Sequence, residues 1–197
     1  MTNKNLYENY MKIFLEENSK VNLISKNDEK YLWEKHIFDS LAISKFFDKY
    51  NPKAETVLDI GTGGGFPSIP IAITYPKIKV TAVDSIGKKI KAVLAIADKL
   101  RLENINPICS RVENLNGEYD IVVSRAVSSL KNICEYALPK LKKDGYFIAY
   151  KSKKAHEEIA EAKTVLNKYK AQVIDIIEYE LPLEEILVRN LIIINKK

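Results

Sequence analysis

A glycine cluster that separates an apolar segment from the start of a helix sets the narrowest limits on the architecture of this chain. Residues 57–70 read VLDIGTGGGFPSIP. Glycine allows the backbone to turn sharply and lets a ligand approach it without interference from a side chain. A strand, a glycine-rich turn and a helix in this order predict a loop that binds a nucleotide-like ligand.

Strand-like and helix-like segments alternate along the rest of the chain. Strands are expected at residues 56–60, 79–83, 105–109, 119–124 and 146–150, and helices at 67–75, 86–100, 130–141 and 155–169. This alternation predicts a doubly wound α/β fold, in which helices cover both faces of a mostly parallel sheet. Two more strands, at 172–178 and 187–195, have no helix between them, so the last strand is predicted to run antiparallel to the others.

The first fifty residues are expected to form a helical extension. Leu6, Tyr10, Ile13 and Phe14 recur at spacings of three and four residues, which is the period of an amphipathic helix. Pro52 ends this pattern, because the residue before a proline is disfavoured in the helical region. A chain of 197 residues is ordinary for one domain. We therefore expect residues 1–50 to pack on a single folding unit of residues 51–197.

The composition limits where the chain works and what it binds. No apolar run reaches the roughly 20 residues that span a bilayer, and the first residues lack the apolar core of a signal peptide. A cytoplasmic protein without membrane contact is expected. Two cysteines and two histidines are too few for a zinc site, so no metal is expected. Cys109 and Cys134 are predicted to be reduced and buried.

The glycine pattern narrows the choice of ligand. A dinucleotide fingerprint requires G-x-G-x-x-G, but Phe66 takes the third glycine position when the count begins at Gly61 and Gly63. No G-K-[ST] follows the loop, which disfavours ATP binding of the P-loop kind. Asp84 ends the second strand, where a carboxylate accepts hydrogen bonds from ribose hydroxyls. Capping of the following helix is the alternative role of Asp84.

Three further residues follow predicted strands and are candidates for the same site. Ligands of open α/β sheets bind at the carboxyl ends of the strands, near the switch in strand order. Arg125, after the fourth strand, is therefore expected to face the pocket, with a surface salt bridge as the alternative. Val112 and Glu113, after the third strand, are expected where an adenine would lie if Asp84 holds the ribose.

Basic residues gather in one segment of a chain whose net charge is +5. Residues 140–154 contain six lysines and a single acidic residue, Asp144. A basic patch attracts polyanions, although a lysine run also occurs as an ordinary solvated face. Lys151, Lys153 and Lys154 follow the fifth strand at its pocket end and are the candidates for contact with an RNA backbone.

Five motifs occur in order along the chain. They are HIFDSL (36–41), LDIGTGGGFPSIPIAI (58–73), VDSIGKKIKAV (83–93), SRVENL (110–115) and VVSRAVSSL (122–130). Together they resemble the RsmG family, also called glucose-inhibited division protein B. The chain differs from many relatives at Gly64 and Phe66, and it lacks the glycine that commonly follows Lys151.

The resemblance implies a class I methyltransferase with a Rossmann-like, seven-stranded sheet. Members of the family transfer a methyl group from S-adenosylmethionine to the N7 atom of a guanine in bacterial 16S ribosomal RNA. The implied cofactor-binding residues are Gly61, Gly63, Phe66, Asp84, Val112, Glu113 and Arg125. Arg125 would position the reactants, and no general base is expected because N7 carries no proton that has to leave.

The implied partner is the RNA of the small ribosomal subunit or the subunit itself. His36 joins the three pocket-end lysines as a candidate RNA contact, since with Asp39 and Ser40 it is expected on a helical edge over the pocket. Helix capping and core packing explain these three residues nearly as well. The protein is expected to act as a monomer without a protein partner.

Three other functions stay open on the sequence alone. A small-molecule methyltransferase would keep the cofactor loop but require a lid over an apolar pocket. A non-catalytic ribosome-assembly factor would keep the fold without the reaction. A nicotinamide oxidoreductase is disfavoured by the broken glycine fingerprint.

Overall fold

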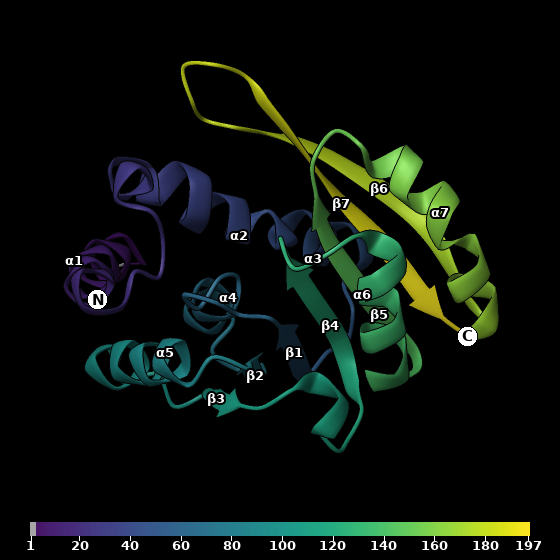
Figure 1. Ribbon diagram of the computed structural model, residues 1–197, viewed down its shortest axis with the longest axis horizontal. Coiled ribbons are helices and arrows are strands. Elements are labelled where there is room, and N and C mark those ends of the chain that lie inside the picture. The colour runs from purple at the N-terminus through teal and green to yellow at the C-terminus, as the bar shows by residue number, and fades with distance from the viewer. Residues whose placement is uncertain (1–2) are drawn as a thin grey trace.

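The strands form one seven-stranded sheet in the order β3-β2-β1-β4-β5-β7-β6 (Figure 1). The structure is a computed structural model that describes residues 3–197. The strands are β1 (Thr56–Ile60), β2 (Lys79–Asp84), β3 (Ile105–Cys109), β4 (Tyr119–Arg125), β5 (Leu141–Lys151), β6 (Ala171–Leu181) and β7 (Leu187–Lys196). The predicted α/β architecture is confirmed.

Five strands, β1 to β5, pair in parallel, and β7 pairs antiparallel with both β5 and β6. The expected reversal of the last strand is therefore confirmed. The order switches at β1, which lies between β2 and β4. The carboxyl ends of these three strands border a crevice where open α/β sheets bind their ligands.

Helices precede, connect and follow the parallel strands. The N-terminal segment contains α1 (Asn3–Val21), the 3₁₀ helix η1 (Lys26–Tyr31), the π-helix η2 (Leu32–Phe38), α2 (Asp39–Leu41) and α3 (Ile43–Tyr50). The remaining helices are α4 (Ser68–Thr74), α5 (Gly87–Leu100), η3 (Val112–Asn114), α6 (Leu130–Ala137), η4 (Leu138–Lys140) and α7 (Ala155–Lys168). The α-helix predicted at 130–141 ends early because Pro139 does not fit a helix interior, and β5 begins at Leu141.

Alternate residues of the central strands bury their side chains on opposite faces of the sheet. Leu58 and Val122 join the core beneath α6 and α7, whereas Val57 and Val123 join the core beneath α3 and α4. Burial on both faces explains why these strands read as continuous apolar runs. Figure 1 shows α6 and α7 together on one side of the sheet.

The N-terminal helix α1 packs against α5 through a cluster of aromatic and aliphatic side chains. Tyr10 and Phe14 of α1 share this cluster with Phe66 of the glycine loop and Val93 of α5. The ring centroids of Phe14 and Phe66 are 5.0 Å apart. The extension thus touches the loop predicted to bind a ligand. Residues 1–2 of the expected extension lie outside the described residues, and its folding as one unit with 51–197 stays a prediction.

Across residues 3–197 the helices are all too short or too polar to cross a membrane.

Candidate active site

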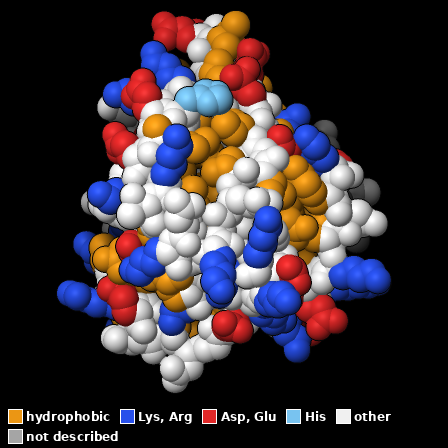
Figure 2. Space-filling model, turned by 90° about the vertical axis from the view of Figure 1, so that its right-hand side faces the viewer, with side chains coloured by type: hydrophobic (Ala, Val, Ile, Leu, Met, Phe, Trp, Pro, Cys, Tyr) orange, Lys and Arg blue, Asp and Glu red, His pale blue; other side chains and the backbone are white. Residues whose placement is uncertain are grey.

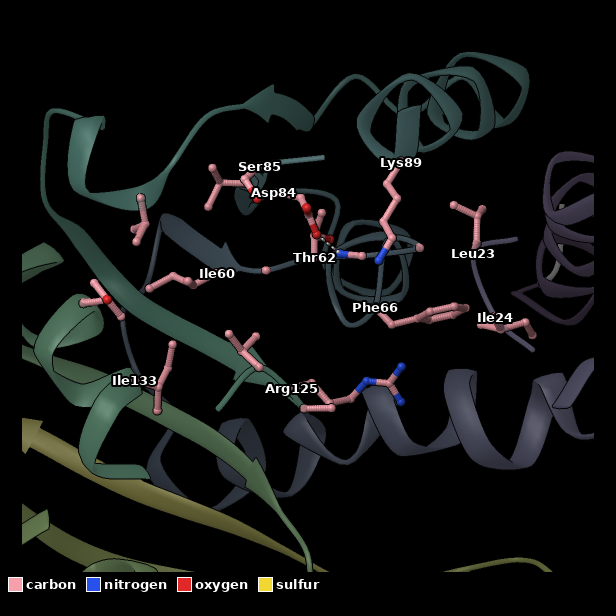
Figure 3. Close-up of a pocket in the computed structure, with 18 of the residues that line it drawn as sticks. Leu23, Ile24, Ile60, Thr62, Phe66, Asp84, Ser85, Lys89, Arg125 and Ile133 are labelled. Carbon is pink, nitrogen blue, oxygen red and sulfur yellow. Dashed lines mark hydrogen bonds between the residues drawn. The ribbon is translucent and has the colours of Figure 1, made fainter. Parts of the chain in front are cut away.

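A cavity of about 640 Å³ opens at the carboxyl ends of β1, β2 and β4 (Figure 3). Its volume lies in the range of small-molecule and cofactor sites, roughly 300 to 1,000 Å³. The residues that the sequence assigned to cofactor binding all line it: Gly61, Gly63, Phe66, Asp84, Val112, Glu113 and Arg125. His36 lines it as well. The structure thus brings together residues that are up to 89 positions apart in the chain, as in the pair His36 and Arg125.

The glycine loop forms the floor of this cavity. Gly61 and Gly63 have φ angles of 72° and 56°, in the left-handed region that favours glycine. The amides of Gly61 and Thr62 both donate to the carbonyl oxygen of Val83, at 2.8 and 2.9 Å, which ties the loop to β2. A Cβ atom on Gly61 would lie 2.5 Å from Cγ2 of Val127. A larger residue at position 61 would therefore have to displace the side chain of Val127, which follows β4.

Asp84 organises the turn that leaves β2. Its Oδ2 accepts the amide of Gly63 at 3.0 Å and its Oδ1 accepts the amide of Ile86 at 2.9 Å. Helix α5 begins only at Gly87, and no side chain caps it. A carboxylate has about four acceptor positions, so Asp84 keeps capacity for hydroxyl groups in the cavity. The structure is compatible with ribose binding and does not support the capping alternative.

The far end of the cavity is formed by the short helix η3. Val112 is buried against the core beneath α6, and the Glu113 carboxylate is exposed at the cavity wall. The amide of Ser110 donates to the carbonyl oxygen of Asp84 at 3.1 Å, which fixes this end against β2. A hydrophobic wall beside a carboxylate suits a flat heterocycle that carries hydrogen-bond donors.

Arg125 ends β4 and is held from several sides. Its Nη1 donates to Oδ2 of Asp39 at 2.9 Å and to the carbonyl oxygen of Lys35 at 3.1 Å. Its Nη2 lies 3.1 Å from Nδ1 of His36, and the guanidinium carbon is 5.2 Å from the centre of the Phe66 ring. The Arg125 side chain is only 16% exposed. It faces the cavity, as predicted, and its ion pair is buried rather than superficial.

Asp39 links Arg125 to the sheet edge. Its side chain is 4% exposed, and its Oδ1 accepts the hydroxyl of Tyr179 in β6 at 2.7 Å. Burial and the neighbouring Asp39 carboxylate raise the pKa of Tyr179 above its ordinary value. Next to this contact, the hydroxyl of Tyr150 donates to the carbonyl oxygen of Ser40 at 2.8 Å. Three distant chain segments therefore meet at one carboxylate.

His36 is held in the neutral form. Burial, followed by the positive charge of Arg125, lowers the pKa of His36 to about 4. An arginine only donates hydrogen bonds, so Nδ1 of His36 must accept and its hydrogen must be on Nε2. That Nε2 is buried and has no partner within residues 3–197. The ring lies 5.1 Å from the ring of Phe66.

Asp59 is a buried acid beneath the loop that sequence reasoning did not single out. It is fully buried in β1, its Oδ2 accepts the amide of Ser68 at 3.2 Å, and its Oδ1 has no partner in the described part of the chain. Burial raises the pKa of Asp59 to about 6, although hydrogen bonds from Thr62 and Ser68 oppose the shift. The hydroxyls of Thr62 and Ser68 are 2.5 Å apart and close the loop across the helix start.

A second cavity of about 370 Å³ lies on the other side of Arg125. It shares Arg125, Ala126 and Val127 with the first cavity. Polar groups dominate the rest of its wall, among them Asp39, Ser128, Lys151, Ser152, Glu158 and Arg189. The Nε atom of Arg189 is buried without a partner among residues 3–197. Arg125 therefore stands at the boundary of two ligand-sized spaces.

The predicted basic segment does not form one patch. Lys140, Lys142 and Lys143 lie at the beginning of β5 and the other three lysines at or just after its end, separated by the regularly paired stretch from Tyr146 to Lys151, which spans about 17 Å. The expectation of a single patch is wrong because a strand extends through the segment. Figure 2 likewise shows basic side chains dispersed among acidic ones on the face that includes α7.

The three pocket-end lysines differ from one another. The Nζ of Lys151 donates to Glu158 at 2.7 Å and to the carbonyl oxygen of Ser128 at 2.6 Å, and its side chain is 11% exposed. Lys153 and Lys154 are exposed beside it. Lys151 is thus part of the second cavity wall, while the other two are accessible to a large polyanion.

Several cavity residues escaped the sequence analysis, Lys89, Leu23 and Ile24 among them. Lys89, in the first turn of α5, points into the large cavity, and Leu23 and Ile24 border it from the turn after α1 (Figure 3). A helix that starts beside a ligand-binding loop places its first-turn residues near the ligand. The position of Lys89 in the sequence could therefore have predicted that it lines the cavity. The sequence gives no comparable indication for Leu23 and Ile24, because only tertiary packing brings α1 to the loop.

The two cysteines differ in environment. Cys134 is buried in α6, and burial raises its pKa to about 12, whereas Cys109 is exposed at the end of β3. The expectation of a buried Cys109 is wrong because β3 is an edge strand whose last residue opens to solvent. Within residues 3–197, no three His, Cys, Asp or Glu side chains are placed to hold a metal ion together.

Comparison with known proteins gives one family. The sequence profile of GidB, described as rRNA small subunit methyltransferase G, matches residues 3–187. Among curated proteins, the Ribosomal RNA small subunit methyltransferase G of Staphylococcus saprophyticus is 40% identical over 196 residues, which cover 97% of this chain and 81% of the relative.

Solved structures show the same fold at low sequence identity. A SAM dependent methyltransferase from Aquifex aeolicus matches with a TM-score of 0.62 and 21% identity, over 89% of this chain and 97% of that chain. M. jannaschii TYW2, solved in complex with AdoMet, matches with a TM-score of 0.61 and 18% identity, over 81% of this chain and 77% of that chain. The predicted class I methyltransferase architecture is confirmed.

Proposed function

The chain belongs to the GidB family of rRNA small subunit methyltransferases, and on this premise we propose that it methylates the N7 atom of a guanine in bacterial 16S ribosomal RNA. S-adenosylmethionine is the methyl donor. The observation that carries the proposal is that every residue assigned to the cofactor by family resemblance lines one cavity. This agreement is specific, because the residues come from four separate motifs.

The cavity fits S-adenosylmethionine in size and in chemistry. Gly61 and Gly63 leave backbone uncovered for the amino acid portion, and a Cβ on Gly63 would meet nothing nearer than 3.9 Å. Asp84 offers acceptor positions to the ribose hydroxyls. Val112 and Glu113 offer an apolar wall and a carboxylate to the adenine. No feature of this cavity favours a nicotinamide dinucleotide.

The reaction requires positioning rather than proton transfer. Bound S-adenosylmethionine supplies an electrophilic methyl group whose bond to sulfur breaks as the N7 lone pair forms the new bond, leaving the bonding electrons on sulfur in S-adenosylhomocysteine. Guanine N7 carries no proton, so the chain needs no general base. Correct orientation of two reactants is worth roughly 7 to 11 kcal/mol of the barrier in favourable systems.

We propose that the second cavity receives the target guanine. It adjoins the cofactor cavity at Arg125, and its Ser128, Glu158 and Arg189 groups can donate to and accept from a base edge. An unpaired nucleotide has to be turned out of its stack to enter such a cavity. Lys153 and Lys154, exposed at the rim, would track the adjoining phosphates.

We further propose that the enzyme acts as a monomer. Light scattering of the purified protein during size-exclusion chromatography would give one 22.5 kDa species.

The decisive experiment identifies the methylated nucleoside. Purified protein is incubated with S-adenosylmethionine labelled in its methyl group and with small ribosomal subunits or their extracted 16S RNA. The RNA is digested and its nucleosides are separated. Label in 7-methylguanosine supports the proposal; label in another nucleoside, or none in either substrate, contradicts it. Comparison of subunit with free RNA also tells which of them is the substrate.

A further inference from the structure

We propose that Asp39 is a positioning residue of this methyltransferase: its carboxylate fixes the orientation of the Arg125 guanidinium between the two cavities and cancels its positive charge there. The inference rests on the proposed function, because it concerns the place where the methyl group moves. The inference gives the N-terminal extension a role in the reaction in addition to its packing against the core.

The contacts of the Arg125 guanidinium leave it little freedom. Both hydrogens of Nη1 are used, one by Asp39 Oδ2 at 2.9 Å and one by the carbonyl oxygen of Lys35 at 3.1 Å. One hydrogen of Nη2 is used by His36. Arginine has five N–H donors, so only Nε–H and one Nη2–H remain for ligands. Tyr179, by donating to the other oxygen of Asp39, fixes the carboxylate itself.

This orientation bears on which atom of guanine stays reactive. Free arginine side chains commonly bind guanine through both O6 and N7, with the two terminal nitrogens acting as a fork. A fork of the two terminal nitrogens needs an Nη1 hydrogen, and Asp39 and Lys35 have taken both. Arg125 therefore cannot cover N7 with that end-on fork, and its contacts to a base are limited to Nε–H and the remaining Nη2–H.

The charge of Asp39 matters as much as its geometry. The sulfonium of the methyl donor is positive, and after transfer the positive charge is on the guanine. Arg125 lines both cavities, so an uncompensated guanidinium would repel the bound donor and the methylated product alike. Like charges a few ångströms apart repel strongly where water is excluded. The Asp39 carboxylate makes the pair neutral.

A purely structural role for Asp39 predicts different behaviour. If the buried ion pair only joined the extension to β4 and β6, breaking it would weaken the binding of all ligands of the cavity equally. A counter-charge predicts selectivity instead. S-adenosylhomocysteine differs from S-adenosylmethionine by the methyl group and its positive charge, so the two ligands separate the roles.

The test measures the dissociation constants of both ligands by calorimetry. The Asp39→Asn substitution keeps the shape of the side chain but removes its charge. In this variant the dissociation constant of S-adenosylmethionine should increase on the order of tenfold more than that of S-adenosylhomocysteine. Asp175→Asn is the matched control, because Asp175 also pairs with a cation and a tyrosine, Lys49 at 2.7 Å and Tyr50 at 3.0 Å, but lies outside both cavities. It should leave the ratio of the two constants unchanged.

A second variant covers the case in which Asp39→Asn folds poorly. The double variant Asp39→Asn/Arg125→Gln has no unpaired charge, so its ratio of the two dissociation constants should return to the wild-type value while methyl transfer stays low. Equal weakening of both ligands in Asp39→Asn, or an altered ratio in the double variant, overturns the inference. Absence of 7-methylguanosine with the wild-type enzyme overturns the proposed function instead, and failure of the wild type to bind S-adenosylmethionine overturns both.

Discussion

The walls of the two cavities are built in different ways. The cofactor wall comes from short contiguous segments after β1, β2 and β3, and backbone conformation holds it: left-handed glycines and amides that donate to Val83 and Asp84. The wall of the second cavity comes from Asp39, Arg125, Lys151 and Arg189, and buried side-chain pairs hold it. One wall is specified by local sequence, the other by the tertiary fold.

Arg125 belongs to both walls, so its removal should have the largest effect. Arg125→Ala leaves the Asp39 carboxylate buried and unpaired, which costs about 3 to 5 kcal/mol of the free energy of unfolding. Methyl transfer should fall on the order of a hundredfold, because a misplacement of the reactants by about 1 Å costs that much. Urea denaturation and turnover on the RNA substrate measure the two effects. Lys163→Ala, an exposed lysine on α7, is the control; near wild-type turnover of Arg125→Ala would refute its positioning role.

A change confined to the cofactor wall should separate binding from stability. Gly61→Ala places a methyl group 2.5 Å from Val127 and forces a left-handed alanine, so the dissociation constant of S-adenosylmethionine should rise on the order of a hundredfold. Gly117→Ala is the matched control, since Gly117 has a φ of 101° but nothing within 4 Å of an added Cβ. Both variants should lose about 1 to 2 kcal/mol of stability from backbone strain. Equal cofactor affinity in the two would show that the loop tolerates a side chain.

Two buried titratable groups make opposite contributions to pH-dependent stability. The pKa of His36 is lowered to about 4, so the unfolded state binds more protons as pH falls through 6.5 and stability declines. The pKa of Asp59 is raised to about 6, so the folded state binds more protons and stability increases over the same range. Between about pH 6.5 and pH 5 each effect amounts to about 1 to 2 kcal/mol.

Substitution of either group should therefore reveal the contribution of the other group to the pH dependence of stability. On acidification, His36→Gln should gain stability relative to the wild type, and Asp59→Asn should lose it. Urea denaturation at the two pH values measures both. If the two variants follow the wild-type pH profile, these groups do not titrate as their surroundings indicate.

The smallest effect is expected at the rim. Lys153→Gln/Lys154→Gln should weaken RNA binding and reduce the slope of log affinity against log salt by about 1.4, since each phosphate contact on a single strand contributes about 0.7. Lys143→Gln/Lys163→Gln removes the same charge away from the cavities and should change the slope less. Filter binding over a salt series gives both slopes. Identical slopes would make Lys153 and Lys154 ordinary solvated surface.

The same difference between the walls explains what the sequence could predict. The α/β alternation and the reversed last strand follow from hydrophobic periodicity, and the glycine loop and the places of Asp84 and Arg125 after strands predict the site, whereas the family resemblance supplied the other cofactor residues. The partners of Arg125 do not follow from spacing, because Asp39 reaches it only through the packing of α2, and Tyr179 reaches Asp39 only through the packing of β6. The prediction of one basic patch at residues 140–154 was wrong for a related reason. Residues that are close in sequence are not close in space when a strand lies between them.

The position of β7 also affects how the chain folds during synthesis. β6 precedes β7 in the chain, yet β7 lies between β5 and β6 and is the only partner of β6 within the described sheet. As it emerges from the ribosome, β6 thus has no strand to pair with and exposes its apolar side chains until residues 187–196 have followed. Tyr179 cannot reach Asp39 before that moment. A nascent chain can therefore complete its cofactor loop early, but the Tyr179 contact that fixes the Asp39 carboxylate forms only with the last strand.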